Sequence, residues 1–129
     1  MAQIKIYGFE DRLQDRMAAL SEVIHGCVME ALAYPAEKRV HRFFPLAAAA
    51  FFVPPDRSRD YTIVEISMFE GRSVAAKKRL IHLLFERVEA ALGIAPVDLE
   101  ITISETPRAN WGIRGQPGDE LTLGYRVEV

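Results

Sequence analysis

The chain has 129 residues, half of them hydrophobic and 26% charged, which is the composition of one ordinary soluble domain. Its 16 basic and 18 acidic residues leave a formal net charge of -2, too balanced for the basic surface that non-specific nucleic-acid binding requires. The longest apolar stretch, residues 43–55, contains Pro45 and is shorter than the roughly 20 residues that cross a bilayer. We therefore expect neither nucleic acid nor a membrane as a partner.

Residue types that hold metals and nucleotides are sparse. One cysteine, Cys27, and three scattered histidines, His25, His41 and His82, offer no ligand spacing for a transition metal. No glycine-rich loop opens a helix after a strand, so we expect no nucleotide cofactor. The chain does not open on a basic segment followed by an apolar run, so we expect no secretory signal and a cytoplasmic location.

Alternating and helical periods predict the elements. Strands are predicted over residues 2–8, 39–44, 61–69, 99–103 and 121–129. Helices are predicted over residues 13–32, between the first two strands, and 76–92, between the third and the fourth. Ser73 is a plausible N-cap of the second helix, and Gly93 lies where a left-handed residue would end it. The order strand, helix, strand therefore occurs twice.

The two halves also match each other in sequence at an offset of 60 residues. Identical pairs are Ile6 and Ile66, Phe9 and Phe69, Glu10 and Glu70, Arg12 and Arg72, Leu20 and Leu80, Val28 and Val88, Ala31 and Ala91, and Leu32 and Leu92. One inserted residue then aligns Pro35 with Pro96. We interpret residues 1–129 as a single domain with internal repeats at about 2–53 and 62–115.

Right-handed crossovers place both helices of such a tandem β-α-β repeat on one face of a four-stranded mixed sheet, an α+β fold. In the strand over 61–69, the residues Ile63, Val64, Ile66 and Met68 are predicted to make both faces apolar. The uncovered face would then expose a large apolar patch, so we expect self-association. The last strand, over 121–129, is predicted to be an extra edge strand that could pair with a neighbouring subunit.

Several motifs of the second half resemble a known family. They are Phe69-Glu70-Gly71-Arg72-Ser73, Lys77, Leu80-Ile81, Ala95-Pro96 and Trp111-Gly112-Ile113-Arg114-Gly115. This pattern resembles a full subunit of 4-oxalocrotonate tautomerase, and the whole chain is similar to the fused, double-length members of the tautomerase superfamily. That group includes malonate semialdehyde decarboxylase and cis-3-chloroacrylic acid dehalogenase. The resemblance implies a homotrimer with a fold like that of the tautomerases and of macrophage migration inhibitory factor (MIF).

The resemblance also implies catalysis by an N-terminal proline, whose amine is desolvated and carries protons beside a carbonyl. Here the matching residue is Ala2. Without Met1, the amine of Ala2 would have an ordinary pKa of about 7.7 to 8.0 unless its pocket lowers it, and a weaker base could remain. With Met1 retained, the terminal nitrogen would lie up to about 3.5 Å further along the chain, and proline-type catalysis would be lost.

Two arginines occupy equivalent places in the repeats. Arg72 follows a strand at a turn into a helix, where a guanidinium can face a carboxylate, and the resemblance makes it the binder of the substrate carboxylate. The alternative is a solvated arginine at a helix start. Arg12 is its counterpart, a second candidate for substrate binding, but its neighbour Asp11 could equally hold it in a local ion pair.

The glycine-rich loop after residue 110 adds two candidates for substrate binding. Trp111, the only tryptophan, could wall the amine pocket or fill a subunit interface. Arg114 is a secondary contact for an anion. In malonate semialdehyde decarboxylase, the segment that resembles residues 34–39 supplies an aspartate that helps activate water, and Lys38 occupies that position here. This replacement argues against decarboxylase and hydratase chemistry.

Two functions are compatible with these residues. The first is a tautomerase that interconverts the keto and enol forms of a small 2-oxo acid, with Ala2 and Arg72 as catalytic residues and with weak activity. The second is a pseudoenzyme, a trimer that keeps the pocket as a non-catalytic anion-binding or structural module. Both predict a small carboxylate-bearing ligand and no cofactor or metal.

Overall fold

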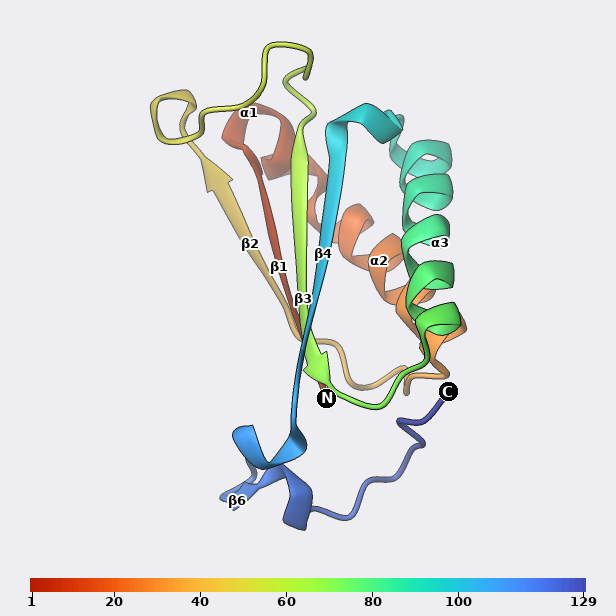
Figure 1. The fold of residues 1–129 in the computed structure, drawn as a ribbon. Coiled ribbons are helices and arrows are strands. Elements are labelled where there is room, and N and C mark those ends of the chain that lie inside the picture. Colours follow the sequence, from red (N-terminus) through yellow and green to blue (C-terminus); the bar gives the residue numbers. More distant parts are fainter.

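The computed structural model describes residues 1–129, and its elements follow the predicted order (Figure 1). The strands are β1 (Ala2–Phe9), β2 (His41–Leu46), β3 (Thr62–Phe69), β4 (Leu99–Thr106), β5 (Gly112–Ile113) and β6 (Gln116–Pro117). The helices are α1 (Glu10–Leu13), α2 (Met17–Leu32) and α3 (Val74–Leu92). A short 3-10 turn, Gln14–Arg16, joins α1 to α2, so the first predicted helix is interrupted near its start.

The main sheet has the strand order β2-β1-β3-β4. Within each repeat the two strands are parallel, while β1 and β3 run antiparallel at the centre, with Ala2 opposite Met68. Helices α2 and α3 cover one face of the sheet, as predicted (Figure 1). The start of the chain therefore lies beside the end of β3, where the second repeat turns into α3.

The core lies between this sheet and its two helices. Alternate residues of β1 and β3 point toward the helices and are fully buried, among them Ile4, Ile6, Val64, Ile66 and Met68. Leu20, Ile24 and Val28 of α2 and Leu80, Leu84 and Val88 of α3 complete this layer. Cys27 belongs to it as well. None of the helices combines the length and the apolarity that a membrane crossing requires.

Both predicted boundaries of α3 are confirmed. The hydroxyl of Ser73 accepts a hydrogen bond from the backbone N–H of Ala76 at 3.1 Å, which satisfies one of the free donors at the helix start. Gly93 has φ 70°, a left-handed conformation that favours glycine, and its N–H bonds back to Glu89. These local signals fix the direction in which the chain enters and leaves α3.

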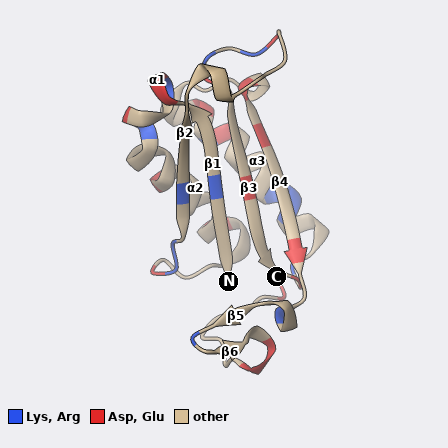
Figure 2. Ribbon diagram, turned by 90° about the vertical axis from the view of Figure 1, so that its left-hand side faces the viewer, with Lys and Arg blue, Asp and Glu red and all other residues tan.

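The expectation that the centre of the sheet is apolar on both faces is wrong. Of the four residues on which this expectation rested, only Ile63 points away from the helices, because Val64, Ile66 and Met68 all alternate to the inner face. Basic residues lie on β1 and β2 and acidic residues on β3 and β4 (Figure 2), and the strand register places Lys5, Arg42, Glu65 and Glu100 on the outer face. Its apolar part is confined to the neighbourhood of Tyr7, which stacks on Phe44 with ring centroids 4.7 Å apart.

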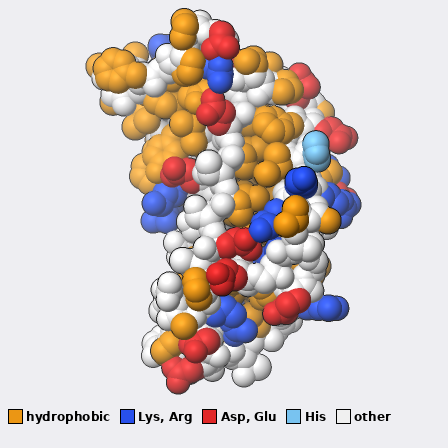
Figure 3. All heavy atoms as spheres, viewed as in Figure 1, with side chains coloured by type: hydrophobic (Ala, Val, Ile, Leu, Met, Phe, Trp, Pro, Cys, Tyr) orange, Lys and Arg blue, Asp and Glu red, His pale blue; other side chains and the backbone are white.

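Exposed hydrophobic side chains lie elsewhere on the molecule. In the view of Figure 3 they gather toward the end of the sheet where the loop after β2 lies, and charged side chains are frequent toward the opposite end. Phe52, in that loop, is 92% exposed. Strand β2 itself is shifted to His41–Leu46 and includes Pro45, which an edge strand tolerates because one side of it forms no ladder.

The predicted strand over 121–129 does not form within the chain. The segment crosses the lower end of the molecule as irregular backbone (Figure 1), and the carbonyl of Val129 accepts a hydrogen bond from the N–H of Ser73 at 3.0 Å. Val127 is buried against Gly71, where a Cβ would lie 3.0 Å from Cγ1 of Val127 and where φ is 128°, a conformation that favours glycine. The alternating apolar residues of this segment thus pack on the strand ends instead of joining an edge.

Candidate active site

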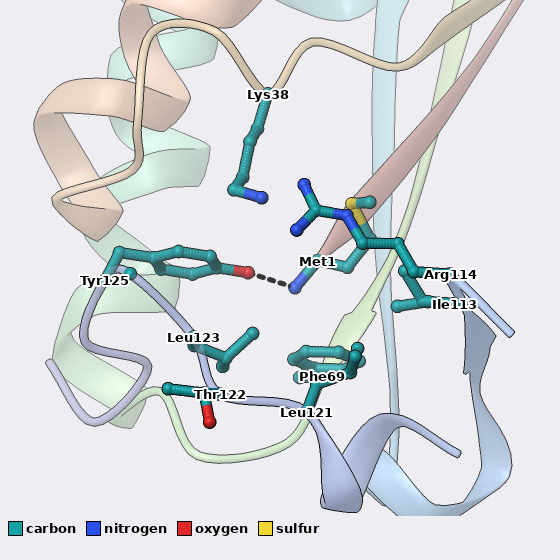
Figure 4. Close-up of a pocket in the computed structure, with 10 residues that line it drawn as sticks. Met1, Lys38, Phe69, Ile113, Arg114, Leu121, Thr122, Leu123 and Tyr125 are labelled. Carbon is teal, nitrogen blue, oxygen red and sulfur yellow. Dashed lines mark hydrogen bonds between the residues drawn. The ribbon is translucent and has the colours of Figure 1, made fainter. Parts of the chain in front are cut away.

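Three distant parts of the chain meet at the end of the sheet where β1 begins and β3 ends. The carbonyl of Met1 accepts a hydrogen bond from the N–H of Phe69 at 3.2 Å, which extends the pairing of β1 with β3. The C-terminal segment closes the far side (Figure 4). The residues that line the resulting cavity are Met1, Lys38, Phe69, Ile113, Arg114, Leu121, Thr122, Leu123, Gly124 and Tyr125.

The terminal amine of Met1 lies within this cavity and donates a hydrogen bond to the hydroxyl of Tyr125 (Figure 4). Burial lowers the pKa of this amine from 8.0 to about 4, and the positive charges of Arg72, Lys38 and Arg108 act in the same direction. The amine is consequently unprotonated near neutral pH. Because Met1 is present, the terminal amine lies one residue before the nitrogen of Ala2, as expected, yet this amine remains inside the cavity.

Ala2 is 3% exposed, and its backbone N–H donates a hydrogen bond to the hydroxyl of Tyr34 at 3.0 Å. This is the nitrogen that removal of Met1 would convert into the terminal amine. The rings of Tyr34 and Tyr125 meet edge to face, with centroids 5.3 Å apart. Burial raises the pKa of Tyr34 to about 12 and also raises the pKa of Tyr125, so both hydroxyls keep their protons.

Arg72 is 5% exposed, so the interpretation of it as a solvated arginine is wrong. Its Nη1 donates to the carbonyl of Phe69 at 3.2 Å, whereas its Nε and Nη2 have no hydrogen-bond partner. Burial lowers the pKa of Arg72, and the nearby Tyr125 and Tyr34 act against that shift. Arg72 does not line the cavity, but its charge lowers the pKa of the terminal amine, and two of its buried donors are left without an acceptor.

The loop after β4 supplies part of the wall. Arg114 and Gly115, with φ of 52° and 79°, form the two-residue turn between β5 and β6, and Arg114 lines the cavity. Trp111 does not line it. Its ring packs edge to face on Phe69, with centroids 5.3 Å apart, and its indole N–H donates to the hydroxyl of Thr106 at 3.1 Å. Trp111 therefore supports the wall from behind.

Arg108 holds this loop closed and was not predicted. Its guanidinium donates to the carbonyl of Gly118 at 2.9 and 3.1 Å and to that of Leu121 at 3.0 Å. The same group lies over the ring of Phe69, 5.5 Å from its centroid. Lys38 was expected only as the replacement of an aspartate, and it too lines the cavity, with its ammonium 5.6 Å from the centroid of the Tyr125 ring.

Arg12 is not brought to this cavity, because it follows β1 and thus lies at the other end of the sheet. It is 50% exposed in its side chain and forms an ion pair with Asp60 at 3.6 Å. Its neighbour Asp11, the partner considered from the sequence, instead pairs with Arg59 at 2.8 Å. A smaller hollow there contains Arg12, Arg16 and Asp60 but has no terminal amine.

The described side chains include no group of three or more His, Cys, Asp or Glu residues that could hold a metal ion. The buried His25 uses its Nε2 in a hydrogen bond with the carbonyl of Ala36 at 2.8 Å. The titratable groups that line the cavity are the amine of Met1, Tyr125, Lys38 and Arg114, and Tyr34 lies next to Tyr125. Such a set can bind an anion and transfer a proton.

Two β-α-β units in one mixed sheet, with a desolvated terminal amine and a buried arginine at one end, define the tautomerase class of protein. Residues 38–114 match the family described as tautomerase enzymes. This match spans more than half of the chain, and the chain belongs to that family.

Individual proteins agree with this assignment. The 2-hydroxymuconate tautomerase of Pseudomonas putida is 37% identical over 57 residues, which are 44% of this chain and 90% of that protein. A malonate semialdehyde decarboxylase structure superposes with a TM-score of 0.80 at 22% identity and covers 92% of this chain and 99% of its own. An asymmetric trimer of the fused 4-OT named F6 has a TM-score of 0.79 at 23% identity, covering 91% and 96%. The two solved structures show that the fold is shared.

Proposed function

We propose that the protein is a tautomerase that interconverts the keto and enol forms of a small 2-oxo acid. The observation that carries the proposal is geometric: the amine of Met1 and the buried nitrogen of Ala2, which removal of Met1 would make the terminal amine, lie beside Tyr125 and Tyr34 at one cavity, and Arg72 is buried nearby with two unused donors. The amine would carry the proton and Arg72 would bind the substrate carboxylate. We also propose a cytoplasmic location.

In this reaction the neutral amine takes a proton from one atom of the substrate and becomes an ammonium. It then gives the proton to another atom, so that the substrate is isomerised and the amine is restored. Low solvent access helps both steps, since a desolvated ammonium is a stronger acid than an exposed one. The protonated hydroxyl of Tyr125 can stabilise negative charge on the substrate oxygen.

The replacement of proline by Ala2 is expected to make this activity weak. A proline nitrogen is held by its ring, whereas a primary amine rotates freely about its bond to Cα. The hydroxyl of Tyr34, 3.0 Å from the nitrogen of Ala2, would restrict that rotation once Met1 is removed. Arg114, on the cavity wall, would provide a second contact for the anion, and Trp111 would keep the wall in place.

We further propose that the protein is a homotrimer, like the asymmetric trimer of the fused 4-OT F6, with which it shares its fold. The polar outer face of the sheet and the exposed Phe52 are the surfaces available for subunit contacts. The alternative function is a catalytically inactive trimer that binds small carboxylates. The absence of proline at position 2 favours an inactive protein. The unpaired donors of Arg72 favour anion binding over a purely structural role.

The test is ketonisation of an aromatic enol-pyruvate by protein whose N-terminal residue has been verified by mass. Activity above buffer that is lost in Arg72→Ala supports the enzyme. If protein without Met1 shows no activity, the proposal is wrong, and stabilisation by small carboxylates that requires Arg72 would identify the binding module. Low activity could come from the missing proline or from a changed cavity, and Ala2→Pro separates these two causes. A large gain in ketonisation means that only the base is missing, and no gain means that the cavity itself has diverged.

A further inference from the structure

We propose that the chain has a second anion-binding site, at the opposite end of the sheet from the amine cavity, and that its ligand is a phosphate group. The site is the hollow beside α1 (Figure 1), where the charged side chains of Arg12, Arg16, Arg59 and Asp60 meet. In the free protein the carboxylate of Asp60 occupies the place of the anion. The site takes no part in the proposed tautomerase reaction, so each proposal can fail without the other.

The hollow is the repeat counterpart of the amine cavity. Phe9 is equivalent to Phe69, and each ring has an arginine over it. Arg59 lies 4.5 Å from the centroid of Phe9, and Arg108 lies 5.5 Å from that of Phe69. Because β1 and β3 are antiparallel, the two arrangements lie at opposite ends of the sheet. The start of β3, unlike that of β1, is an internal part of the chain, so this end has cations without a terminal amine and is suited to anion binding alone.

Asp60 is a poor partner for the two arginines that precede α2. Its Oδ1 lies 3.0 Å from Nη1 of Arg16 and 3.6 Å from Nη1 of Arg12. This oxygen is buried but accepts no hydrogen bond, so it is aligned with neither guanidinium. A phosphate group has more acceptor oxygens than a carboxylate, and it can accept paired hydrogen bonds from both guanidinium forks.

The charges of the hollow favour a dianion. Arg59 is already paired with Asp11 at 2.8 Å. Arg12 and Arg16 then carry two positive charges, of which the single negative charge of Asp60 balances one. A phosphate dianion in place of Asp60 would balance both, whereas a monocarboxylate would only repeat what Asp60 provides.

Asp60 can give way without a change in the backbone. Its N–H donates to the hydroxyl of Ser58 at 3.1 Å, and its carbonyl accepts from the hydroxyl of Thr62 at 2.8 Å. These bonds hold the main chain on both sides of the carboxylate, which is itself partly exposed. Rotation of the side chain alone therefore moves the carboxylate into solvent and leaves the two guanidinium groups accessible to phosphate.

The experiment is a titration of isotope-labelled protein with inorganic phosphate, above neutral pH and at constant ionic strength, followed by the NMR shifts of backbone amides. Gly8, Leu13 and Thr62 report on this hollow, and Leu123 and Gly124 report on the amine cavity. We expect saturable shifts in the first group. Acetate should bind there at least about tenfold more weakly, because it lacks the second charge.

Matched variants should act in opposite directions. Asp60→Asn keeps the shape of the side chain but removes its competing charge, so it should tighten phosphate binding by about tenfold or more. Arg12→Gln and Arg16→Gln should each weaken binding by about tenfold or more, as expected for the loss of hydrogen bonds to a charged group. Arg79→Gln is the control and should bind like the parent, since Arg79 is exposed on α3 and pairs with Glu30.

Shifts confined to the amine cavity would overturn the inference, as would equal affinities of the hollow for phosphate and acetate. Unchanged binding in Asp60→Asn would also overturn it, and a gain there cannot arise from a loss of folded protein. Methyl phosphate distinguishes two sources of the ligand. Binding tighter than that of inorganic phosphate supports a site for the phosphate ester of a small molecule, and equal or weaker binding supports a site for free phosphate.

Discussion

Arg72 is buried with two of its nitrogen donors unpartnered, although transfer of a charged group into the interior is costly when its hydrogen bonds are not replaced. No carboxylate forms an ion pair with it, since Glu105, whose charge acts on Arg72, is paired with Lys77, and the nearby tyrosines keep their protons. A ligand carboxylate would supply the missing acceptors. The free protein is therefore expected to be less stable because it keeps this anion site.

Replacement of Arg72 by methionine tests that trade-off. Met fills a similar volume without unpaired donors, so Arg72→Met should raise the free energy of unfolding by about 1 to 3 kcal/mol while abolishing ketonisation. Urea denaturation measures the first effect. Arg126→Met, at an exposed position of the C-terminal segment, is the control and should change stability by less than about 0.5 kcal/mol. A less stable Arg72→Met protein would mean that the contacts of the guanidinium contribute more free energy than its burial costs.

The sequence could identify those residues of the site that belong to local motifs. Arg72 and Arg114 lie in segments with a clear turn pattern, and both lie at or beside the cavity. Tyr34 and Tyr125 were not found, because they reach the amine only through tertiary contacts between distant segments. Arg12 was included through the repeat, but the two repeats end at opposite ends of the antiparallel pair β1 and β3.

At the scale of elements, the strands and helices of the two repeats followed from periodicity, while the C-terminal segment did not. Alternation in residues 121–129 predicts that every second side chain is buried, but it does not specify a strand partner. Val127 and Tyr125 do pack inward, yet over the ends of the strands and not along an edge. Burial was thus predictable there, and hydrogen bonding was not.

The loop between β4 and the C-terminal segment depends on one close approach. A Cβ on Gly118 would lie 2.5 Å from the carbonyl oxygen of Arg108 and 3.1 Å from Cβ of Trp111. Gly118 also donates its N–H to the carbonyl of Trp111 at 2.7 Å. The loop can be closed over the cavity only while this position has no side chain.

Gly118→Ala should therefore displace the loop, lower the free energy of unfolding by about 1 to 3 kcal/mol and reduce ketonisation. Trp111 is the only tryptophan, so its fluorescence reports the change directly as a red shift. Gly112→Ala is the matched control, since a Cβ there meets nothing within 4 Å. Equal spectra and stabilities for the two variants would show that the loop is not held by this contact.

At the scale of the whole molecule, the outer face of the sheet is divided by charge (Figure 2). Lys5 of β1 is paired in register with Arg42 of β2 on one side and with Glu65 of β3 on the other. A face with a basic half and an acidic half can pack on a rotated copy so that opposite charges meet. This complementarity is a physical reason to place the contacts of the proposed trimer on the sheet face.

Glu65→Lys would make the centre of this face basic and should weaken the proposed trimer by about tenfold or more in dissociation constant. Light scattering coupled to size-exclusion chromatography, over a dilution series, measures the effect, which should diminish at high salt. Glu89→Lys makes the same charge change at an exposed position of α3 and should leave the assembly intact. Dissociation by both variants alike would exclude the sheet face as the specific contact.

Stability should also depend on pH because two groups are held without a proton in the folded state. Burial lowers the pKa of the Met1 amine from 8.0 to about 4, and burial with the charges of His25 and Arg39 lowers the pKa of His41 from 6.5 to about 4. Between about pH 4 and 8 the unfolded chain therefore binds more protons than the folded one. The free energy of unfolding must rise with pH across this window and fall on acidification.

His41→Asn separates the two contributions. It removes the titrating group while an amide can still bond to the hydroxyl of Ser21, which lies 2.8 Å from Nδ1 of His41. Urea denaturation at a series of pH values should show a flatter dependence between about pH 4 and 6.5, where His41 contributes. The slope between 6.5 and 8 belongs to the amine and should persist. His82→Asn, at an exposed position of α3, should reproduce the parent curve, and flattening of the upper range in His41→Asn would contradict the assignment.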